Sequence, residues 1–413
     1  MSAAIGGGPA GSAAVRRHNL GLVLETLRVG PLSRAELAAR TGLTRATVAS
    51  LVEPLLGSVL AEETAAPRGV GRPARPVRFH PRGPVALGIA VDVDSLTVAL
   101  LDLGGEVVAQ RTERGDNRAH SPDALSARAA SLARGVRDEA GRVVLGAGLA
   151  LPAVVDGADG SDGSVSARAG AGRAGMSRVD AGAGSVGDGA SAVVLRAPNL
   201  PRWAGARPGP PLEAALGVPV VVENEATAGA VAHLGVAPDF VYVSAGIGIG
   251  GGIVLGGRIF RGVRGLAGEL GHVVVERDGP RCGCGGRGCV EQYAGRAALL
   301  QDAGAPDVAA LATALARGDG RAAAATRRAG AALGVALASV LNVLDVPTVV
   351  LGGDYAPLAG ALAPAVATEL RTRALHPDPP AILPSDLDGS AAVRGAAHLV
   401  LEQVFRRPTL LSA

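Results

Sequence analysis

The sequence predicts an α/β protein in which an N-terminal winged helix-turn-helix precedes a larger α/β domain of two lobes. Residues 18–56 carry the pattern of three short helices, with a glycine turn before the third. From residue 84 onward, strands alternate with helices in two blocks, which is typical of a two-lobed α/β domain with a cleft. The chain has 413 residues, nearly half of them apolar, and is long enough for two or three domains.

Charge is distributed unevenly along the chain. The first 82 residues contain eleven arginines, five glutamates and no aspartate, a charge of +6, whereas the whole chain carries +3. A basic module in front of a mildly acidic body favours a polyanionic partner at that end, although an ordinary solvated arginine surface has the same composition. The chain contains no lysine, which excludes a Schiff base, a Walker phosphate loop and the kinase strand lysine.

The N-terminal module follows from helix signals taken in order. A first helix is expected at about 18–29, where apolar residues recur at helical spacing. Ser33 and Glu36 form a capping box that opens the second helix. A glycine turn at 41–43 separates it from a third helix, which Thr44 caps. Helix, glycine turn and helix of this length are the helix-turn-helix pattern.

The third helix is expected to enter the major groove of double-stranded DNA. Its N-terminal side chains would face phosphates and base edges, namely Thr44, Arg45, Thr47 and Ser50. Pro54 is expected to end or kink the helix near Glu53, because proline removes a helical hydrogen bond.

A loop rich in glycine, proline and arginine follows between two short extended segments. Arg68 and Arg72 in this loop are suited to a narrow minor groove, which makes the loop a candidate wing. The alternative is a basic linker between domains. With the preceding helices taken into account, we predict a winged helix-turn-helix over residues 15–80, behind a disordered tail at residues 1–14.

The two-lobed domain is expected to occupy residues 84–413. Strands are predicted at 85–92, 96–102, 106–111, 143–151, 218–222, 240–244 and 348–351. Helices are predicted at 122–138, 211–217, 226–234, 296–303, 306–317, 320–343, 355–374 and 390–406. Residues 157–191 are a Gly/Ala/Ser/Asp run with too little apolar content to pack, so we predict a disordered insertion there.

All three cysteines of the chain lie within eight residues, and one histidine lies ten residues upstream of them. Three thiolates and an imidazole make a complete tetrahedral set for structural Zn²⁺, with no position left open for chemistry. The alternative is three buried free cysteines. We predict Zn²⁺ ligation by His272, Cys282, Cys284 and Cys289.

The same cysteines predict the cellular compartment of the protein. Clustered cysteines of this kind are no disulfide framework, so a reducing cytoplasm is expected. The uncharged apolar stretch at 330–344 is too short to span a bilayer, and no membrane association is expected.

The segment from Glu269 to Glu291 resembles the zinc-binding signature of the ROK family, which comprises repressors, open reading frames and sugar kinases. It reads Glu-x-Gly-His, then Cys-x-Cys-Gly, then Gly-Cys-x-Glu. The Gly-Arg-Pro of the candidate wing also resembles ROK repressors. This resemblance implies an actin-like (ribonuclease H-like, ASKHA) sugar-kinase-type fold. It further implies a sugar cleft lined by Asn199, Asn224, Glu225, Glu269, His272 and Glu291. The alternative for Glu269 and Glu291 is that they only brace the zinc loop.

Two of three kinase features of the family are altered here. Its kinases carry Asp-x-Gly-x-Thr in the first hairpin, but Asp94 stands at the glycine position, where a carboxylate repels phosphate. Glu225 replaces the base aspartate, and such a displacement can cost ~10²-fold in rate. Only the second glycine-rich loop, Gly246 to Gly252, is present. We therefore predict no catalytic residue and no kinase activity.

The resulting prediction is a ROK-type DNA-binding regulator, a repressor, whose operator affinity is controlled by a sugar or sugar derivative. A homodimer or homotetramer is expected, because DNA half-sites mirror protein two-fold symmetry. The alternative is an ATP-dependent sugar kinase with an appended DNA-binding domain. A third reading is a sugar-independent regulator whose cleft is vestigial or binds a protein.

Overall fold

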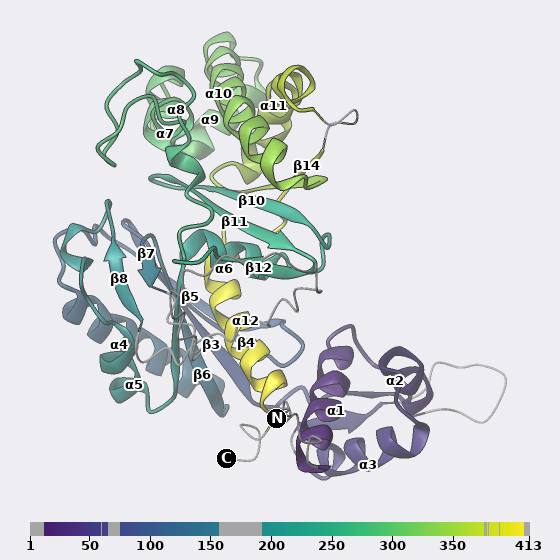
Figure 1. Ribbon diagram of the computed structural model, residues 1–413. Coiled ribbons are helices and arrows are strands. Elements are labelled where there is room, and N and C mark those ends of the chain that lie inside the picture. Colours follow the sequence, from purple (N-terminus) through teal and green to yellow (C-terminus); the bar gives the residue numbers. More distant parts are fainter. Residues whose placement is uncertain are drawn as a thin grey trace, which may run out of the picture.

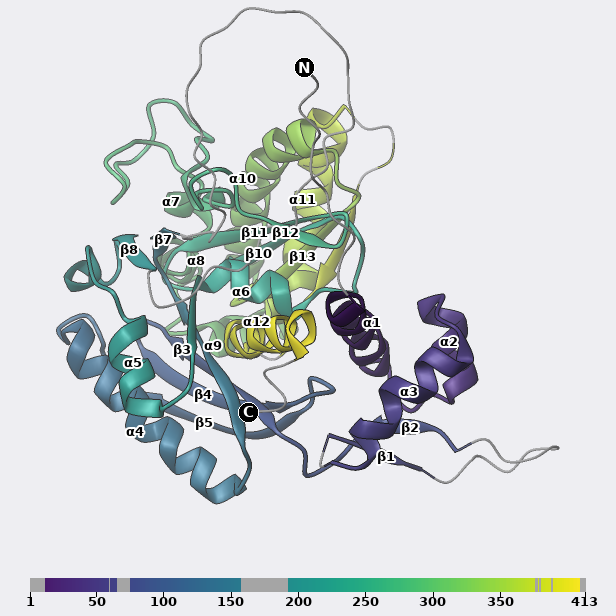
Figure 2. The ribbon, with the colours of Figure 1, turned by 60° about the horizontal axis from the view of Figure 1, so that its bottom comes forward.

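The computed structural model describes residues 12–58, 60–64, 75–156, 192–375, 378, 380–387 and 389–408. A small helical domain lies beside two stacked lobes. The C-terminal helix lies between the two lobes (Figures 1 and 2). Three predictions lie outside the described residues. They are the first eleven residues of the disordered tail, the wing tip with Arg68 and Arg72, and the insertion at 157–191.

The N-terminal domain contains three helices and a two-stranded hairpin. These are α1 (Ser12–Leu27), α2 (Arg34–Thr41), α3 (Arg45–Leu56), β1 (Ala61–Glu63) and β2 (Val77–Phe79). β1 and β2 are antiparallel, with Ala61 opposite Phe79. The capping box is confirmed, because the Ser33 hydroxyl accepts from the Glu36 amide and the Glu36 carboxylate accepts from the Ser33 amide at 2.8 Å. α1 begins inside the predicted tail, at Ser12.

Pro54 was expected to end or kink α3 near Glu53, and it does not end the helix there. The helix continues through Pro54 to Leu56, and Gly57 follows as its C-cap. Proline at this position leaves the carbonyl of Ser50 without its usual helical donor. The Arg16 guanidinium of α1 donates to that carbonyl at 3.2 Å, which supplies the missing hydrogen bond.

The first lobe is built on a five-stranded sheet. Its strands are β3 (Val85–Val91), β4 (Ser95–Asp102), β5 (Val107–Arg114), β6 (Val144–Leu151) and β9 (Val220–Asn224), in the order β5-β4-β3-β6-β9. One face packs on α4 (Pro122–Ala140) and α5 (Gly209–Leu216) in a core around Leu87, Ile89 and Trp203. The other face, with Ala86 and Ala99, packs on α12 (Ala391–Arg406).

The second lobe repeats this topology. Its strands are β10 (Phe240–Ala245), β11 (Ile249–Leu255), β12 (Arg258–Phe260), β13 (Thr348–Gly353) and β14 (Ala381–Pro384), in the order β12-β11-β10-β13-β14. In both lobes three antiparallel strands are followed by parallel ones. The predicted loop from Gly246 to Gly252 is shorter than expected, because β11 begins at Ile249.

Helices cover one face of the second sheet. They are α7 (Glu291–Ala294), α8 (Arg296–Ala303), α9 (Val308–Ala316), α10 (Gly320–Leu344) and α11 (Ala359–Arg373). Among the described residues, α10 is the one helix long and apolar enough to cross a membrane. It is longer than the uncharged stretch considered above, but it buries Ala329, Leu333 and Leu337 in the core of this lobe. α10 is therefore a core helix here.

Two helices, α6 (Glu225–Ala232) and α12, pack together between the lobes (Figures 1 and 2). Gly395 of α12 meets the backbone of α6 so closely that a Cβ there would lie 1.7 Å from the carbonyl oxygen of Ala228. Only glycine permits this approach. The predicted two-lobed α/β fold is confirmed, and α12 is the element that touches both lobes and the N-terminal domain.

Candidate functional site

A pocket of 330 Å³ opens between the two lobes. It lies where β6, β9 and the segment after β8 (Val193–Arg196) face the start of β11 and the cysteine-rich loop. All six residues predicted to contact a sugar line it: Asn199, Asn224, Glu225, Glu269, His272 and Glu291. Amide and carboxylate groups converging on one pocket can share hydrogen bonds with several hydroxyl groups.

The four predicted metal ligands come together beside the pocket. The ligand atoms of His272, Cys282, Cys284 and Cys289 all lie within 4.8 Å of one another. The Sγ atoms of Cys284 and Cys289 are 3.7 Å apart, as are the Cys282 Sγ and the His272 Nδ1. A tetrahedral ion with Zn–S bonds near 2.3 Å separates two sulfurs by about 3.8 Å. The four residues thus fit one tetrahedral metal ion.

His272 is one of the four predicted metal ligands and also lines the pocket. Its Nδ1 faces the Cys282 sulfur, whereas its Nε2 lies 3.9 Å from a carboxylate oxygen of Glu269. One ring nitrogen is therefore available to a metal while the other side of the ring faces the pocket. A metal-bound ring held in this way fixes the direction of its remaining N–H.

Glu291 links the cysteine-rich loop to the glycine turn before β11. Its carboxylate accepts from the Ile249 amide at 3.1 Å, and its other oxygen lies 3.9 Å from the Cys282 sulfur. A Cβ on Gly248 would lie 2.5 Å from that carboxylate, so a larger residue there would displace the Glu291 side chain. Glu291 both braces the cysteine-rich loop and lines the pocket. A bracing role and contact with a sugar are therefore compatible for this residue.

Asn224 caps α6 with its side chain. Its Oδ1 accepts from the amides of Ala226 and Thr227, and its Nδ2 donates to the Ala153 carbonyl at 3.0 Å. One N–H of the amide is left for a ligand. The cap holds the adjacent Glu225 at the first position of the helix, facing the pocket.

Glu225 lies at the boundary between this pocket and a second cavity of 610 Å³. Burial raises its pKa to about 8, the nearby carboxylate of Asp92 adds to the rise, and the Arg296 guanidinium opposes it. Burial likewise raises the pKa of Asp92. A carboxyl group with such a pKa is mostly protonated at neutral pH and can then donate a hydrogen bond to a ligand.

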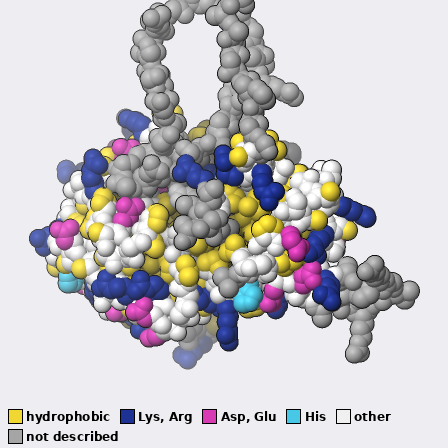
Figure 3. Space-filling view, turned by 90° about the horizontal axis from the view of Figure 1, so that it is seen from below, with side chains coloured by type: hydrophobic (Ala, Val, Ile, Leu, Met, Phe, Trp, Pro, Cys, Tyr) yellow, Lys and Arg dark blue, Asp and Glu magenta, His cyan; other side chains and the backbone are white. Residues whose placement is uncertain are grey.

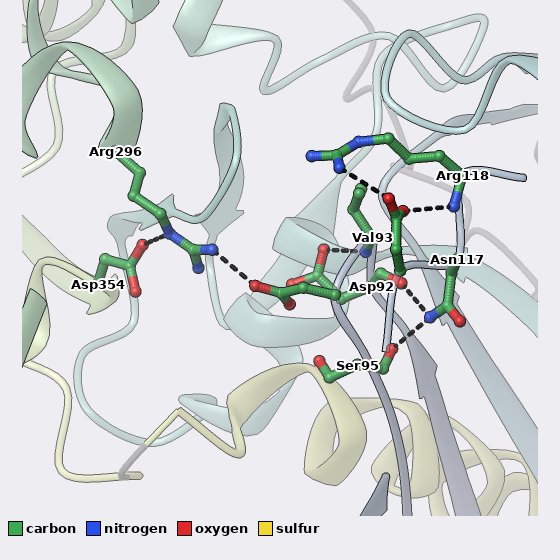
Figure 4. A network of polar contacts seen from close by, with 9 residues as sticks. Asp92, Val93, Ser95, Asn117, Arg118, Arg296 and Asp354 are labelled. Atoms are coloured by element: carbon green, nitrogen blue, oxygen red, sulfur yellow. Dashed lines mark hydrogen bonds and ion pairs between the residues drawn. The ribbon is translucent and has the colours of Figure 1, made fainter. Parts of the chain in front are cut away.

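The second cavity is crossed by an ion-paired arginine (Figure 4). The Arg296 guanidinium, at the start of α8 in the second lobe, donates to Asp94 in the first hairpin at 2.9 Å. The same guanidinium pairs with Asp354, which follows β13. The Asn117 amide holds the hairpin from its other side by donating to the carbonyls of Asp92 and Ser95. Asp94, Arg296 and Asp354 thus bridge the lobes.

Residues 86–403 match the ROK family model, which is most of the chain. The chain belongs to the ROK family. The xylose repressor of Bacillus spizizenii is 26% identical over 409 residues, which cover 94% of this chain and 96% of that protein. The N-acetylmannosamine kinase of Escherichia coli is 37% identical, but only over 161 residues, 37% of this chain and 55% of the kinase.

Solved structures show the same ROK fold. A ROK family transcriptional regulator, a homologue of the Escherichia coli MLC protein, superposes with a TM-score of 0.73 at 24% identity, covering 97% of this chain and 100% of that one. A ROK family glucokinase from Streptomyces griseus in complex with glucose and AMPPNP gives a TM-score of 0.59 at 24% identity, covering 76% and 98%. The likeness to the glucokinase thus spans less of this ROK chain than the likeness to the regulator.

The predicted DNA-facing residues of this ROK chain lie at the start of α3. Thr44, Arg45 and Ser50 are exposed, and Thr47 is half-buried. The Thr44 hydroxyl accepts from the Thr47 amide and caps the helix. Figure 3 shows arginine side chains at several places on the face seen from below, with acidic side chains beside some of them.

Three arginines near the site were not predicted. Arg196 lines the pocket and donates to the Cys284 carbonyl at 2.8 Å. Arg261, after β12, pairs with Glu223 at 2.8 Å beside the α6 cap. Arg296 pairs with Asp94 across 202 positions of sequence. The charge of Asp94, in place of the hairpin glycine, was the one sequence signal that pointed to such a partner.

Proposed function

We propose that this ROK protein is a sugar-responsive transcriptional repressor. A sugar or sugar derivative bound in the 330 Å³ pocket would control the affinity of the N-terminal domain for a double-stranded DNA operator. The observation that carries the proposal is the match to the xylose repressor over 94% of this chain, because it includes the N-terminal domain as well as the two lobes. D-xylose is accordingly the first effector to test.

Helix α12 supports a mechanism for the response. Its N-terminal half touches α6, the helix that begins with Glu225 at the pocket. Its C-terminal half buries Val400, Val404 and Phe405 in one core with α1 of the N-terminal domain. A closure of the lobes that shifts α6 is therefore transmitted to α1 through packed side chains.

A polar contact joins the same two domains. The guanidinium of Arg28, the residue after α1, lies 3.0 Å from the Nδ1 of His398 and 5.8 Å from the centre of the Phe405 ring, both in α12. Burial lowers the pKa of His398 to about 3, and the neighbouring guanidinium of Arg28 adds to this. The neutral ring accepts a hydrogen bond from Arg28, which adds a polar contact to the packing of α1 on α12.

Zn²⁺ is the metal that we assign to the Cys₃His cluster. Bound there, it would supply structure and no catalysis, because four protein ligands leave no open position. His272 and Glu291 both belong to the pocket, and both face the cluster. The loop that presents them to a sugar is therefore held in place by the metal ligands.

Kinase activity is not expected. Asp94 stands at the hairpin position where kinases of the family carry a glycine. Its partner Arg296 lies between that hairpin and the second lobe. Glu225 stands in place of the base aspartate of those kinases, and its extra methylene displaces the carboxylate. We further propose a homodimer or homotetramer in the cytoplasm, binding two half-sites related by two-fold symmetry.

The test is capture of fragmented genomic DNA on the purified full-length protein, with and without D-xylose and other sugars. A repressor should enrich a few inverted-repeat sites at moderate salt, where non-specific binding is weak. Loss of those sites with one sugar would identify the effector. The absence of any enriched site, together with sugar-dependent consumption of ATP, would instead establish the kinase alternative.

A further inference from the structure

We propose that Arg296 is a positioning residue for the sugar pocket, and that its ion pair with Asp94 holds the two lobes at the separation that sugar binding requires. This inference deepens the proposed function and rests on it. It explains how the pocket is kept ready for a sugar, and it gives Asp94 a role beyond the loss of a kinase feature.

The ion pair joins the two lobes directly (Figure 4). Asp94 lies in the turn between β3 and β4 of the first lobe, and Arg296 is the first residue of α8 in the second lobe. Their side chains meet at 2.9 Å, and only 26% of the Arg296 side chain is exposed. Water and salt screen a partly buried pair less than an exposed one, so this pair can resist separation of the lobes.

The first lobe holds Asp94 in a fixed turn. The side-chain amide of Asn117 is buried and donates to the carbonyls of Asp92 at 2.7 Å and of Ser95 at 3.0 Å, which flank Asp94. The Asp94 carbonyl itself accepts from the Gly115 amide at 3.0 Å. Because the backbone around Asp94 is already ordered, its carboxylate loses little further conformational freedom when it pairs with a residue of the other lobe.

The second lobe connects Arg296 to a residue of the pocket. The short helix α7, which precedes α8, begins with Glu291, and Glu291 lines the pocket. Gly295, between the two helices, donates its amide to the Glu291 carbonyl at 2.9 Å. Asp354 holds the same guanidinium within the second lobe. A displacement of Arg296 is therefore passed to Glu291 and to the wall of the pocket that Glu291 forms.

An apolar contact accompanies the ion pair. Ile247, in the glycine turn between β10 and β11 of the second lobe, lines the pocket and packs against the core of the first lobe. This contact does not depend on the charge of Asp94, because the hydrophobic effect follows the apolar area removed from water. Loss of the ion pair should thus loosen the two lobes without unfolding either of them.

The paired arrangement is the one in which the pocket is complete. The six predicted sugar contacts come from both lobes, with Asn199 in the first and Glu269 in the second, and all of them line one pocket where the ion pair is formed. If fewer molecules adopt this arrangement, the apparent affinity for a sugar falls by the same factor. Breaking the pair should therefore weaken sugar binding roughly tenfold.

The experiment is isothermal titration calorimetry of the full-length protein with D-xylose, D-glucose and N-acetylmannosamine. Asp94→Asn keeps the shape of the side chain and removes its charge, so a sugar that binds wild-type protein should bind this variant roughly tenfold more weakly. Asp302→Asn is the matched control, because Asp302 pairs with Arg328 at the same 2.9 Å but within the second lobe. It should bind the sugar as wild-type protein does.

Two outcomes of this titration are decisive. Equal or tighter sugar binding by Asp94→Asn would overturn the inference and leave the proposed repressor intact. Failure of all three sugars to bind wild-type protein would overturn both.

A salt titration and a double variant distinguish the ion pair from a general loss of structure. These sugars are uncharged, so their affinity for wild-type protein should fall only as salt screens the pair, by roughly two- to threefold between about 0.05 M and 0.5 M sodium chloride. Affinity for Asp94→Asn should not vary with salt. The double variant with Arg296→Gln should bind no more weakly than Arg296→Gln alone, because both substitutions remove one interaction. Additive losses, or a wild-type affinity that ignores salt, would remove the ion pair from the explanation.

Discussion

The ring of Phe405, near the end of α12, stacks on the ring of Phe79 in β2, with the ring centroids 6.0 Å apart and the planes within 8°. Phe79 belongs to the hairpin of the N-terminal domain, and Phe405 belongs to the helix that also touches α6. The stack therefore joins the hairpin next to the proposed wing to the helix that packs on α6. Together with the packing of α1 on α12, it is a contact through which we propose that sugar binding reorients the N-terminal domain.

Phe405→Ala should uncouple DNA binding from sugar binding. The substitution leaves a cavity between the domains, with a loss of about 3–5 kcal/mol if the site does not collapse. Sugar affinity should be retained, because no atom of Phe405 lines the pocket, while the sugar-dependent change in operator affinity is lost. Fluorescence anisotropy of a labelled operator, with and without the sugar, measures this.

Phe260→Ala is the matched control, because Phe260 is an exposed phenylalanine on β12 of the second lobe. It should keep the sugar response. A full response in the Phe405 variant, with the N-terminal domain still folded by circular dichroism, would show that the signal takes another route.

Gly395→Ala tests the contact between α12 and α6. A Cβ would lie 1.7 Å from the Ala228 carbonyl oxygen, so the two helices must move apart. Such overpacking is expected to cost about 1–3 kcal/mol of unfolding free energy. Gly360→Ala in α11 is the control, since nothing lies within 4 Å of its added Cβ. That variant should be neutral or more stable by about 0.5–1 kcal/mol. Urea denaturation compares the two, and equal midpoints would contradict the close approach of the helices.

Cys284→Ser should remove the metal and weaken sugar binding. Wild-type protein should contain one zinc ion per chain by plasma mass spectrometry, and the variant none, because a hydroxyl is a poor substitute for a thiolate ligand. The loop that presents His272 and Glu291 should loosen, and the sugar-induced thermal shift should disappear. A variant without metal that still released DNA on adding sugar would separate the metal from the response.

Arg45→Ala should weaken operator binding and leave sugar binding unchanged. Arg45 is exposed at the first position of α3, beside the Thr44 cap. Loss of one phosphate contact lowers the slope of log affinity against log salt by about 1, and loss of a base contact costs about 1–3 kcal/mol. Titrations at several salt concentrations distinguish the two. Arg327→Ala, on the exposed side of α10, should change neither affinity nor slope.

Whether the sequence alone predicts a feature depends on how far apart along the chain the residues of that feature lie. The Ser33–Glu36 capping box and the three cysteines lie within a few residues of one another, so local patterns reveal them. The pairing of Arg296 with Asp94 spans 202 positions, and no local pattern announces it. The strands β7 (Val154–Asp156), β8, β12 and β14 were missed, because three or four residues are too few to establish an alternating pattern.

Pro54 shows the same limit in a helix. Its sequence signal correctly identifies a missing hydrogen bond but not the partner that replaces it. Arg16 lies 34 positions away and is brought to the Ser50 carbonyl by the packing of α1 on α3. This tertiary contact satisfies the carbonyl that Pro54 leaves without a donor, which the local rule does not anticipate.

Glu225→Gln should flatten the dependence of stability on pH. Burial raises the pKa of Glu225 from 4.5 to about 8, so the folded state holds this proton more tightly than the unfolded state does. The contribution of Glu225 to stability is fully present below about pH 4.5 and is lost as the pH rises through about 8. Over that window wild-type protein should lose stability on the order of a few kcal/mol relative to the variant.

Thermal unfolding of both proteins from pH 5 to pH 9 measures this difference. The variant should unfold at the higher temperature above pH 8, because a neutral amide replaces a carboxylate that is forced to ionise near Asp92. Glu139→Gln is the control, since Glu139 is exposed on α4 and pairs with Arg111 at 2.8 Å. It should follow the wild-type curve. Parallel curves for wild type and Glu225→Gln would mean that burial does not raise the pKa of Glu225.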